Sequence, residues 1–285
     1  MKVLLLFEME RIKSYFKLVR IQNNFITFIS VLLGGFVGDV SSWLKLILAA
    51  CSASFISAGG YALNDYFDLE IDRINRPQRV LPEGIISPER ALLFSISLFA
   101  SGFILSLFLK PISVVMSVVA IIFLSLYSAR FKRELLIGNI TVSLICALTF
   151  IYGGVFSYNP EISYIPALFA FLFHMGRELV KDMEDLDGDK VLKSETFPIS
   201  YGIRNSQLLV IAIFLVLIIL TIFPYKLNIF SIYYLILVLI MDLILFYIML
   251  SLWNNPSREN LSSLSRILKF EMLLGLLAIF VGKLG

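Results

Sequence analysis

The chain has 285 residues, 59% of them hydrophobic and only 16% charged, with a formal net charge of +3 and a mean hydropathy of +0.89. Soluble domains carry roughly a quarter charged residues, so this composition excludes a water-soluble globular protein. The small net charge gives no reason to expect a nucleic-acid partner.

The chain opens with residues 1–20, MKVLLLFEMERIKSYFKLVR, whose short apolar core has charged residues on both sides. This pattern is typical of an interfacial amphipathic helix and not of a secretory signal. Nine apolar runs follow, each long enough to cross a bilayer as a helix. They cover about 21–38, 42–63, 91–109, 112–129, 135–156, 162–180, 207–224, 229–252 and 267–284. Because these runs are continuous, they predict an all-α, polytopic bundle of nine transmembrane helices in a single domain over residues 1–285.

Basic residues fall mainly on one side of this predicted topology. Of the 24 Lys and Arg residues, the other side holds only Lys45, Lys110, Lys226 and Lys283. Since an excess of Lys and Arg marks the cytoplasmic side, we expect a multi-pass protein of the cell membrane. Its N-terminus would lie inside and its C-terminus outside. Two inner connections are long, at about 64–90 and 181–206.

Each of these two long loops carries aspartates at the same spacing. NDYFDLEID contains Asp65, Asp68 and Asp72, and KDMEDLDGD contains Asp182, Asp185 and Asp189. Spacings of three and four residues place each set along one face if the helix continues through it. At about 6 Å and an effective dielectric of about 20, each pair of carboxylates repels by about 3 kcal/mol. We therefore expect a positive partner at each set.

A divalent cation bound to a phosphate would offset this repulsion. Magnesium binds oxygen ligands and commonly joins one or two carboxylates to substrate phosphates, and Asn64 could add a neutral oxygen. Arg and Lys both bind phosphate, and several are expected near the same face. These are Arg76, Arg79, Lys132, Arg133, Arg177, Lys181 and Lys193. Beside spans rich in Phe and Leu, this pattern predicts loss of diphosphate from an allylic carbon, with Tyr61, Tyr66 or Tyr127 beside the allylic cation.

The same residues resemble the UbiA family of membrane prenyltransferases. NDYFDLEID fits that family's NDxxDxxxD motif, and DMEDLDGD is similar to its second Asp motif. INRPQRVLPEG, YSARFKR and KSETFPISYG are similar to other loop stretches of the family. LVRIQN resembles its opening Arg-Pro-x-Asn, except that Ile21 replaces the proline. The resemblance covers nearly the whole chain.

The resemblance implies a nine-helix bundle around a central cavity, with 64–90 and 181–206 as cytoplasmic active-site loops. It implies magnesium-dependent transfer of a prenyl group from a prenyl diphosphate to an acceptor. Asn64, Asp68 and Asp72 would hold one magnesium ion, with Asp65 close by, and Asp182, Asp185 and Asp189 would hold another or orient the acceptor. Arg79, Lys132 and Lys181 would contact the diphosphate. The expected catalytic residues are Asp68, Asp72, Asp185 and Asp189. The expected substrate-binding residues are Arg20, Asn23, Arg76, Arg79, Tyr127, Lys132, Arg133, Arg177, Lys181 and Lys193.

The sequence identifies the prenyl acceptor less closely than it identifies the prenyl diphosphate donor. RELVKDMEDLDGD and NDYFDLEIDRINRP look most like the archaeal members of the family. Those members transfer a geranylgeranyl group from geranylgeranyl diphosphate to geranylgeranylglyceryl phosphate, which makes the second ether bond of archaeal lipids. An aromatic prenyltransferase for quinone synthesis, acting on 4-hydroxybenzoate or a related precursor, is the alternative with the same fold and metal.

An ion-coupled transporter is the alternative from another class. Its acids would lie near the middle of the bilayer, whereas here only Asp242 falls well inside a predicted span. A CDP-alcohol phosphotransferase needs Asp-Gly followed shortly by Ala-Arg, but DKVLK follows Asp187-Gly188. Cys51, Cys146 and the single histidine, His174, are expected to pack within spans and not to bind metal.

Overall fold

The computed structural model describes residues 12–191 and 194–285. Within that part, every regular element is a helix, and the one isolated β-bridge joins Val40 and Ser157. The chain divides into two compact units. The first unit comprises residues 12–28 and Ile47–Arg130, and the second comprises Ile29–Leu46 and Phe131–Gly285. The all-helical class is confirmed, while the single domain stays a prediction.

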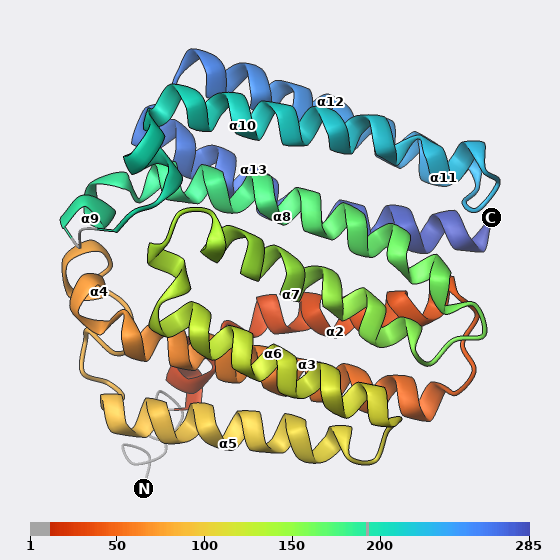
Figure 1. Cartoon of the computed structure of the whole chain (residues 1–285), viewed down its shortest axis with the longest axis horizontal. Coiled ribbons are helices and arrows are strands. Elements are labelled where there is room, and N and C mark those ends of the chain that lie inside the picture. The colour runs from red at the N-terminus through yellow and green to blue at the C-terminus, as the bar shows by residue number, and fades with distance from the viewer. Residues whose placement is uncertain (1–11, 192–193) are drawn as a thin grey trace, which may run out of the picture. The chain divides into compact units, whose positions relative to one another are not determined.

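The first unit holds the helix Ile12–Leu18, the start of α2 (Ile21–Val37), most of α3 (Trp43–Phe67), α4 (Leu69–Asn75), α5 (Pro88–Ser106) and α6 (Pro111–Ala129) (Figure 1). Proline occupies the first position of α5 and α6, where its fixed φ suits a helix and its missing N–H is not needed. Ser87 caps α5 by accepting a hydrogen bond from the backbone N–H of Arg90.

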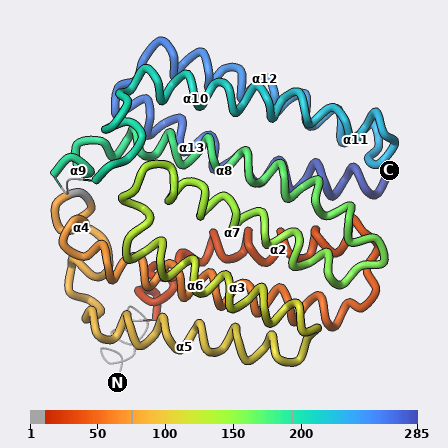
Figure 2. Tube along the Cα trace, in the orientation of Figure 1, coloured from red at the N-terminus to blue at the C-terminus, as the bar shows by residue number. Residues whose placement is uncertain are grey.

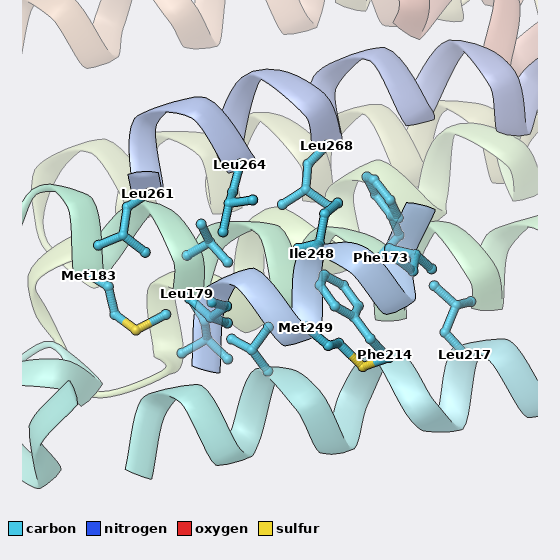
Figure 3. Close-up of a cluster of buried hydrophobic side chains, with 14 residues drawn as sticks. Phe173, Leu179, Met183, Phe214, Leu217, Ile248, Met249, Leu261, Leu264 and Leu268 are labelled. Atoms are coloured by element: carbon cyan, nitrogen blue, oxygen red, sulfur yellow. The ribbon is translucent and has the colours of Figure 1, made fainter. Parts of the chain in front are cut away.

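The second unit holds the rest of α2, the start of α3 and every element after α6. These are η1 (Phe131–Arg133), α7 (Ile137–Gly154), η2 (Pro160–Ser163), α8 (Tyr164–Glu184), α9 (Leu186–Val191), α10 (Phe197–Thr221), α11 (Phe223–Lys226), α12 (Ile232–Asn254) and α13 (Arg258–Leu284). Its core lies among α8, α10, α12 and α13. Figure 3 shows Leu179, Phe214, Ile248 and Leu264 pointing toward one another, one from each of these helices. Leu179 and Met183 of this core lie near the end of α8, so close packing fixes the position of that end.

Six helices of the described chain are long and apolar enough to cross a membrane, and the bent pair Ile12–Leu18 with Ile21–Val37 would make seven. The expected span at 162–180 falls mostly in α8, and the one at 267–284 lies within α13. Both helices carry charged side chains inside their length, among them Arg177, Glu178 and Glu271, which reduces their apolar character. The count of nine spans therefore stays a prediction.

Two glycines let α2 and α7 approach closely within the second unit. A Cβ on Gly153 would meet the carbonyl oxygen of Val31, and a Cβ on Gly34 would meet that of Phe150. Small residues at membrane helix interfaces permit such backbone contact. We expect Gly153→Ala to lower the melting temperature of the purified protein by several degrees, because the added methyl group meets backbone that cannot rotate away.

Gly275→Ala is the matched control for this prediction. A Cβ there would meet only the terminal methyl of Met241, at 3.3 Å, and that flexible side chain can move. A melting temperature unchanged by Gly153→Ala would contradict the close contact of α2 and α7.

Candidate active site

The first Asp cluster comprises Asn64, Asp65, Asp68 and Asp72, and it lies where α3 gives way to α4 (Figure 2). Asp68 stands between the two helices with φ −91° and ψ 1°. The helical hydrogen bonds nevertheless continue, from the N–H of Asp68 to the carbonyl of Asn64 (2.9 Å) and from the N–H of Asp72 to that of Asp68 (2.8 Å). Asn64, Asp68 and Asp72 therefore follow one another at one-turn intervals.

The second Asp cluster comprises Asp182, Asp185 and Asp189, and it repeats this backbone where α8 gives way to α9. Asp185 has φ −90° and ψ 6°, nearly the values at Asp68. The N–H of Asp185 donates to the carbonyl of Lys181 (2.8 Å), and that of Asp189 donates to Asp185 (3.0 Å). The matched spacing in the sequence thus corresponds to a matched helix break in the structure.

Side chains of the first Asp cluster are paired with each other and with arginines. Asn64 Nδ2 donates to Asp68 Oδ2 at 2.8 Å. Arg79 Nη1 lies 2.5 Å from Asp72 Oδ2 and 3.3 Å from Asp65 Oδ1. Burial raises the pKa of Asp72, the charges of Asp68 and Asp65 add to this rise, and Arg79 opposes it. The three carboxylates are thus close enough to repel, and Arg79 is their local counter-charge.

Arg79 reaches these carboxylates because its loop is anchored by apolar side chains. Val80, Leu81 and Ile86 are buried in one cluster with Leu18 and Ala62. The loop also closes on itself, with the N–H of Glu83 donating to the carbonyl of Arg79 at 3.0 Å. The sequence RVLPEG thus combines a basic residue with the apolar residues that fix its position.

Arg20 provides a second cation at this cluster. Its Nη2 lies 2.8 Å from Asp65 Oδ1, and its guanidinium lies over the ring of Tyr61, 4.9 Å from the centroid. Asn23 Nδ2 donates to the Tyr61 hydroxyl at 3.2 Å, and Tyr127 also acts electrostatically on Arg20. The expected residues Arg20, Asn23 and Tyr127 therefore belong to the surroundings of Asp65. Tyr61 joins two of them, a role that its place in the sequence did not indicate.

Asp182 of the second cluster is held by a helix neighbour. Asn139 Nδ2, from α7, donates to Asp182 Oδ2 at 2.7 Å. Burial raises the pKa of Asp182 to about 7, Asn139 opposes the rise, and the charges of Glu178 and Asp189 add to it. No sequence motif marked Asn139 as a partner.

Three charged residues of α8 lie within the five positions before Asp182, and we call them the α8 triad: Arg177, Glu178 and Lys181. Arg177 Nη1 lies 2.7 Å from Glu178 Oε1, and Lys181 Nζ lies 3.0 Å from Glu178 Oε2. Glu178 is only 6% exposed. The sequence indicated both cations as phosphate ligands but not the acid that holds them. The spacing of Glu178 and Lys181, three residues apart on a helix, was the available signal.

The remaining expected residues are distributed as follows. Lys132 and Arg133 lie in η1, where the carbonyl of Arg133 accepts a hydrogen bond from the N–H of Glu195 at 2.8 Å. That bond ties η1 to the loop after α9. Arg76 follows α4, and its N–H donates to the carbonyl of Asp72 at 2.9 Å. Lys193 lies outside the described residues.

The donor atoms of the first Asp cluster suit a hard cation. Asn64, Asp68 and Asp72 present oxygen ligands at successive turns, which is the chemistry that magnesium prefers. Among the described residues, no three His, Cys, Asp or Glu side chains are placed together as a ready metal site. The carboxyl groups of Asp72 and Asp65 face arginines instead. Rotation of these side chains toward a cation would convert the paired arrangement into a ligand set.

Comparison with known proteins gives three concordant matches. Residues 25–274 match the UbiA prenyltransferase family. Digeranylgeranylglyceryl phosphate synthase of Methanocaldococcus jannaschii is 38% identical over 282 residues, covering 96% of this chain and 97% of the relative. A solved structure concerning digeranylgeranylglyceryl phosphate synthase in membranes aligns with TM-score 0.78 and 37% identity, covering 96% and 99% of the two chains.

A more distant structure shares the fold. The UbiA homolog from Archaeoglobus fulgidus, bound to GPP and Mg2+, aligns with TM-score 0.60 at 18% identity, covering 94% of this chain and 100% of that one.

Proposed function

Because this chain belongs to the UbiA prenyltransferase family, we propose that it transfers a geranylgeranyl group from geranylgeranyl diphosphate to geranylgeranylglyceryl phosphate. The product would contain the second ether bond of an archaeal membrane lipid, and diphosphate would be released. The observation that carries the proposal is the duplicated Asp-cluster backbone at Asp68 and Asp185, in a chain 38% identical to a named synthase of this type.

The reaction breaks the allylic C1–O bond of the donor, and the electron pair stays on the diphosphate. The free hydroxyl oxygen of the acceptor forms the new C–O bond and loses its proton. Bound magnesium would supply charge stabilisation to the leaving diphosphate. Asn64, Asp68 and Asp72 would hold one such ion, with Asp65 keeping Arg20 and Arg79 beside them. Asp182, Asp185 and Asp189 would hold another or orient the acceptor.

The cations would bind the phosphate groups and the aromatic faces would stabilise the allylic cation. Arg79 is suited to the donor diphosphate because it already lies 2.5 Å from Asp72. The proposed substrate-binding set is unchanged from the sequence: Arg20, Asn23, Arg76, Arg79, Tyr127, Lys132, Arg133, Arg177, Lys181 and Lys193.

The reaction would occur at the cytoplasmic surface of the cell membrane. The chain is a membrane protein by its family and its apolar spans. The distribution of Lys and Arg supports a cytoplasmic N-terminus, cytoplasmic Asp clusters, nine spans and an outer C-terminus.

A product assay tests the function directly. Purified protein in lipid would receive labelled geranylgeranyl diphosphate and magnesium, with geranylgeranylglyceryl phosphate in one reaction and 4-hydroxybenzoate in another. We expect a diether product in the first reaction only, because the similarity extends over nearly the whole chain of the archaeal relative. EDTA should abolish product and added magnesium should restore it, since the clusters present oxygen ligands.

Two outcomes would change the assignment. Product only with 4-hydroxybenzoate would show that the protein is a prenyltransferase with an aromatic acceptor. Full activity in EDTA, with no divalent ion detected in the protein, would refute the metal-dependent departure of the diphosphate.

A further inference from the structure

The α8 triad consists of two cationic side chains held together by one acidic side chain between them. Glu178 is almost fully buried and uses one carboxylate oxygen for each cation, at 2.7 Å to Arg177 and 3.0 Å to Lys181. One acid thus holds two basic side chains that lie one turn apart on the same face of α8. Two positive charges and one negative charge leave the triad with a net charge of +1.

Both cations keep donors beyond their bonds to Glu178. Arginine has five N–H donors and lysine has three, and neither has an acceptor. The Nε of Arg177 is buried and has no hydrogen-bond partner within the described part of the chain. A buried donor without a partner costs free energy, so a ligand that brings an acceptor to this position would be favoured.

The two clusters differ at the residue just before the first aspartate. That residue is Asn64 in the first cluster, where its amide donates to Asp68. It is Lys181 in the second cluster, where its ammonium is paired with Glu178. A neutral oxygen-bearing side chain suits a metal ion, whereas an ammonium repels one. This position is therefore suited to a metal ligand in the first cluster and to a phosphate ligand in the second.

We propose that Arg177 and Lys181 bind the phosphate monoester of the acceptor, and that Glu178 is the positioning residue that holds both cations in place. This inference rests on the proposed function and adds to it the group that selects a phosphorylated acceptor. It moves Lys181 from the donor site, where the family resemblance places it, to the acceptor site. The physical reason is that Glu178 joins Lys181 to Arg177, which makes the two cations one group.

The test compares two acceptors that differ only in the phosphate: geranylgeranylglyceryl phosphate and geranylgeranylglycerol. We expect Arg177→Gln to raise the KM for the phosphorylated acceptor at least about tenfold, as loss of a charge-assisted hydrogen bond predicts. The KM for geranylgeranyl diphosphate and the kcat/KM for the alcohol should stay within about twofold. A merely structural defect would lower activity toward both acceptors alike.

Glu178→Gln should act in the same direction, because glutamine keeps the shape but no longer attracts both cations. Arg177→Lys should recover part of the preference for the phosphorylated acceptor, since it restores the charge without the fork of donors. The matched control is Arg204→Gln, at an exposed arginine of α10 that stacks on Trp253. It should leave the preference unchanged. If Arg177→Gln does not fold, Lys181→Gln takes its place.

Binding of each acceptor to the protein in nanodiscs, without donor, separates this inference from the proposed function. Suppose that the wild-type protein forms no diether but binds the phosphorylated compound more tightly than the alcohol, and that Arg177→Gln removes this difference. The phosphate site would then be supported and the proposed reaction would be refuted. An increase in the donor KM alone, or an equal loss for both acceptors, would overturn the inference.

Discussion

Asp68→Ala is expected to reduce prenyl transfer by at least about 10²–10³-fold, the loss typical of removing one group that stabilises developing charge. Asp68 is the middle residue of the proposed ligand set, one turn from both Asn64 and Asp72. Its removal would leave two oxygen ligands two turns apart, which is too open to hold one ion. Initial rates with labelled geranylgeranyl diphosphate, over a range of magnesium concentrations, would measure the effect.

Glu70→Ala is the control for Asp68→Ala. Glu70 lies two residues away, but its side chain is 79% exposed and pairs with Arg73. Exposed pairs of this kind contribute little to stability, so activity should stay near that of the wild type. Activity of Asp68→Ala within a few-fold of wild type, in protein that remains folded in the membrane, would rule out the first cluster as the metal site.

Asp185→Ala is expected to cause a loss of similar size in the second cluster. Asp185 occupies the same backbone position as Asp68, at a helix break with nearly equal φ and ψ. If each cluster binds a necessary ion or substrate, neither can replace the other. Asp187→Ala is the matched control, because Asp187 is exposed and falls between the spaced positions of the cluster. Near-normal turnover by Asp185→Ala would show that catalysis depends on the first cluster and does not require Asp185.

The aspartates of a cluster have different surroundings, which spacing alone does not reveal. Asp65 contacts Arg20 and Arg79, whereas Asp68 accepts from Asn64. Asp182 is half-buried and accepts a hydrogen bond from Asn139 of another helix. We therefore expect Asp65 and Asp182 to organise their neighbours, while Asp68 and Asp185 do the larger part of cation binding.

Local features of this protein were determined by the sequence alone. Continuous apolar runs require helices in a bilayer, because backbone polar groups there must be satisfied within the segment. Spacings of three and four residues place the aspartates at successive helical turns, and the hydrogen bonds through Asp68 and Asp185 show those turns. The motifs also predicted the family, which residues 25–274 match.

Contacts between distant residues were decided only by the tertiary structure. Asn139 reaches Asp182 across 43 positions, and Arg20 reaches Asp65 across 45. No periodicity encodes such pairs, since they depend on how helices pack and on which buried polar groups need partners. Glu178 shows the same limit: its acidic side chain is evident from the sequence, but only its burial between Arg177 and Lys181 makes it the centre of a cationic group.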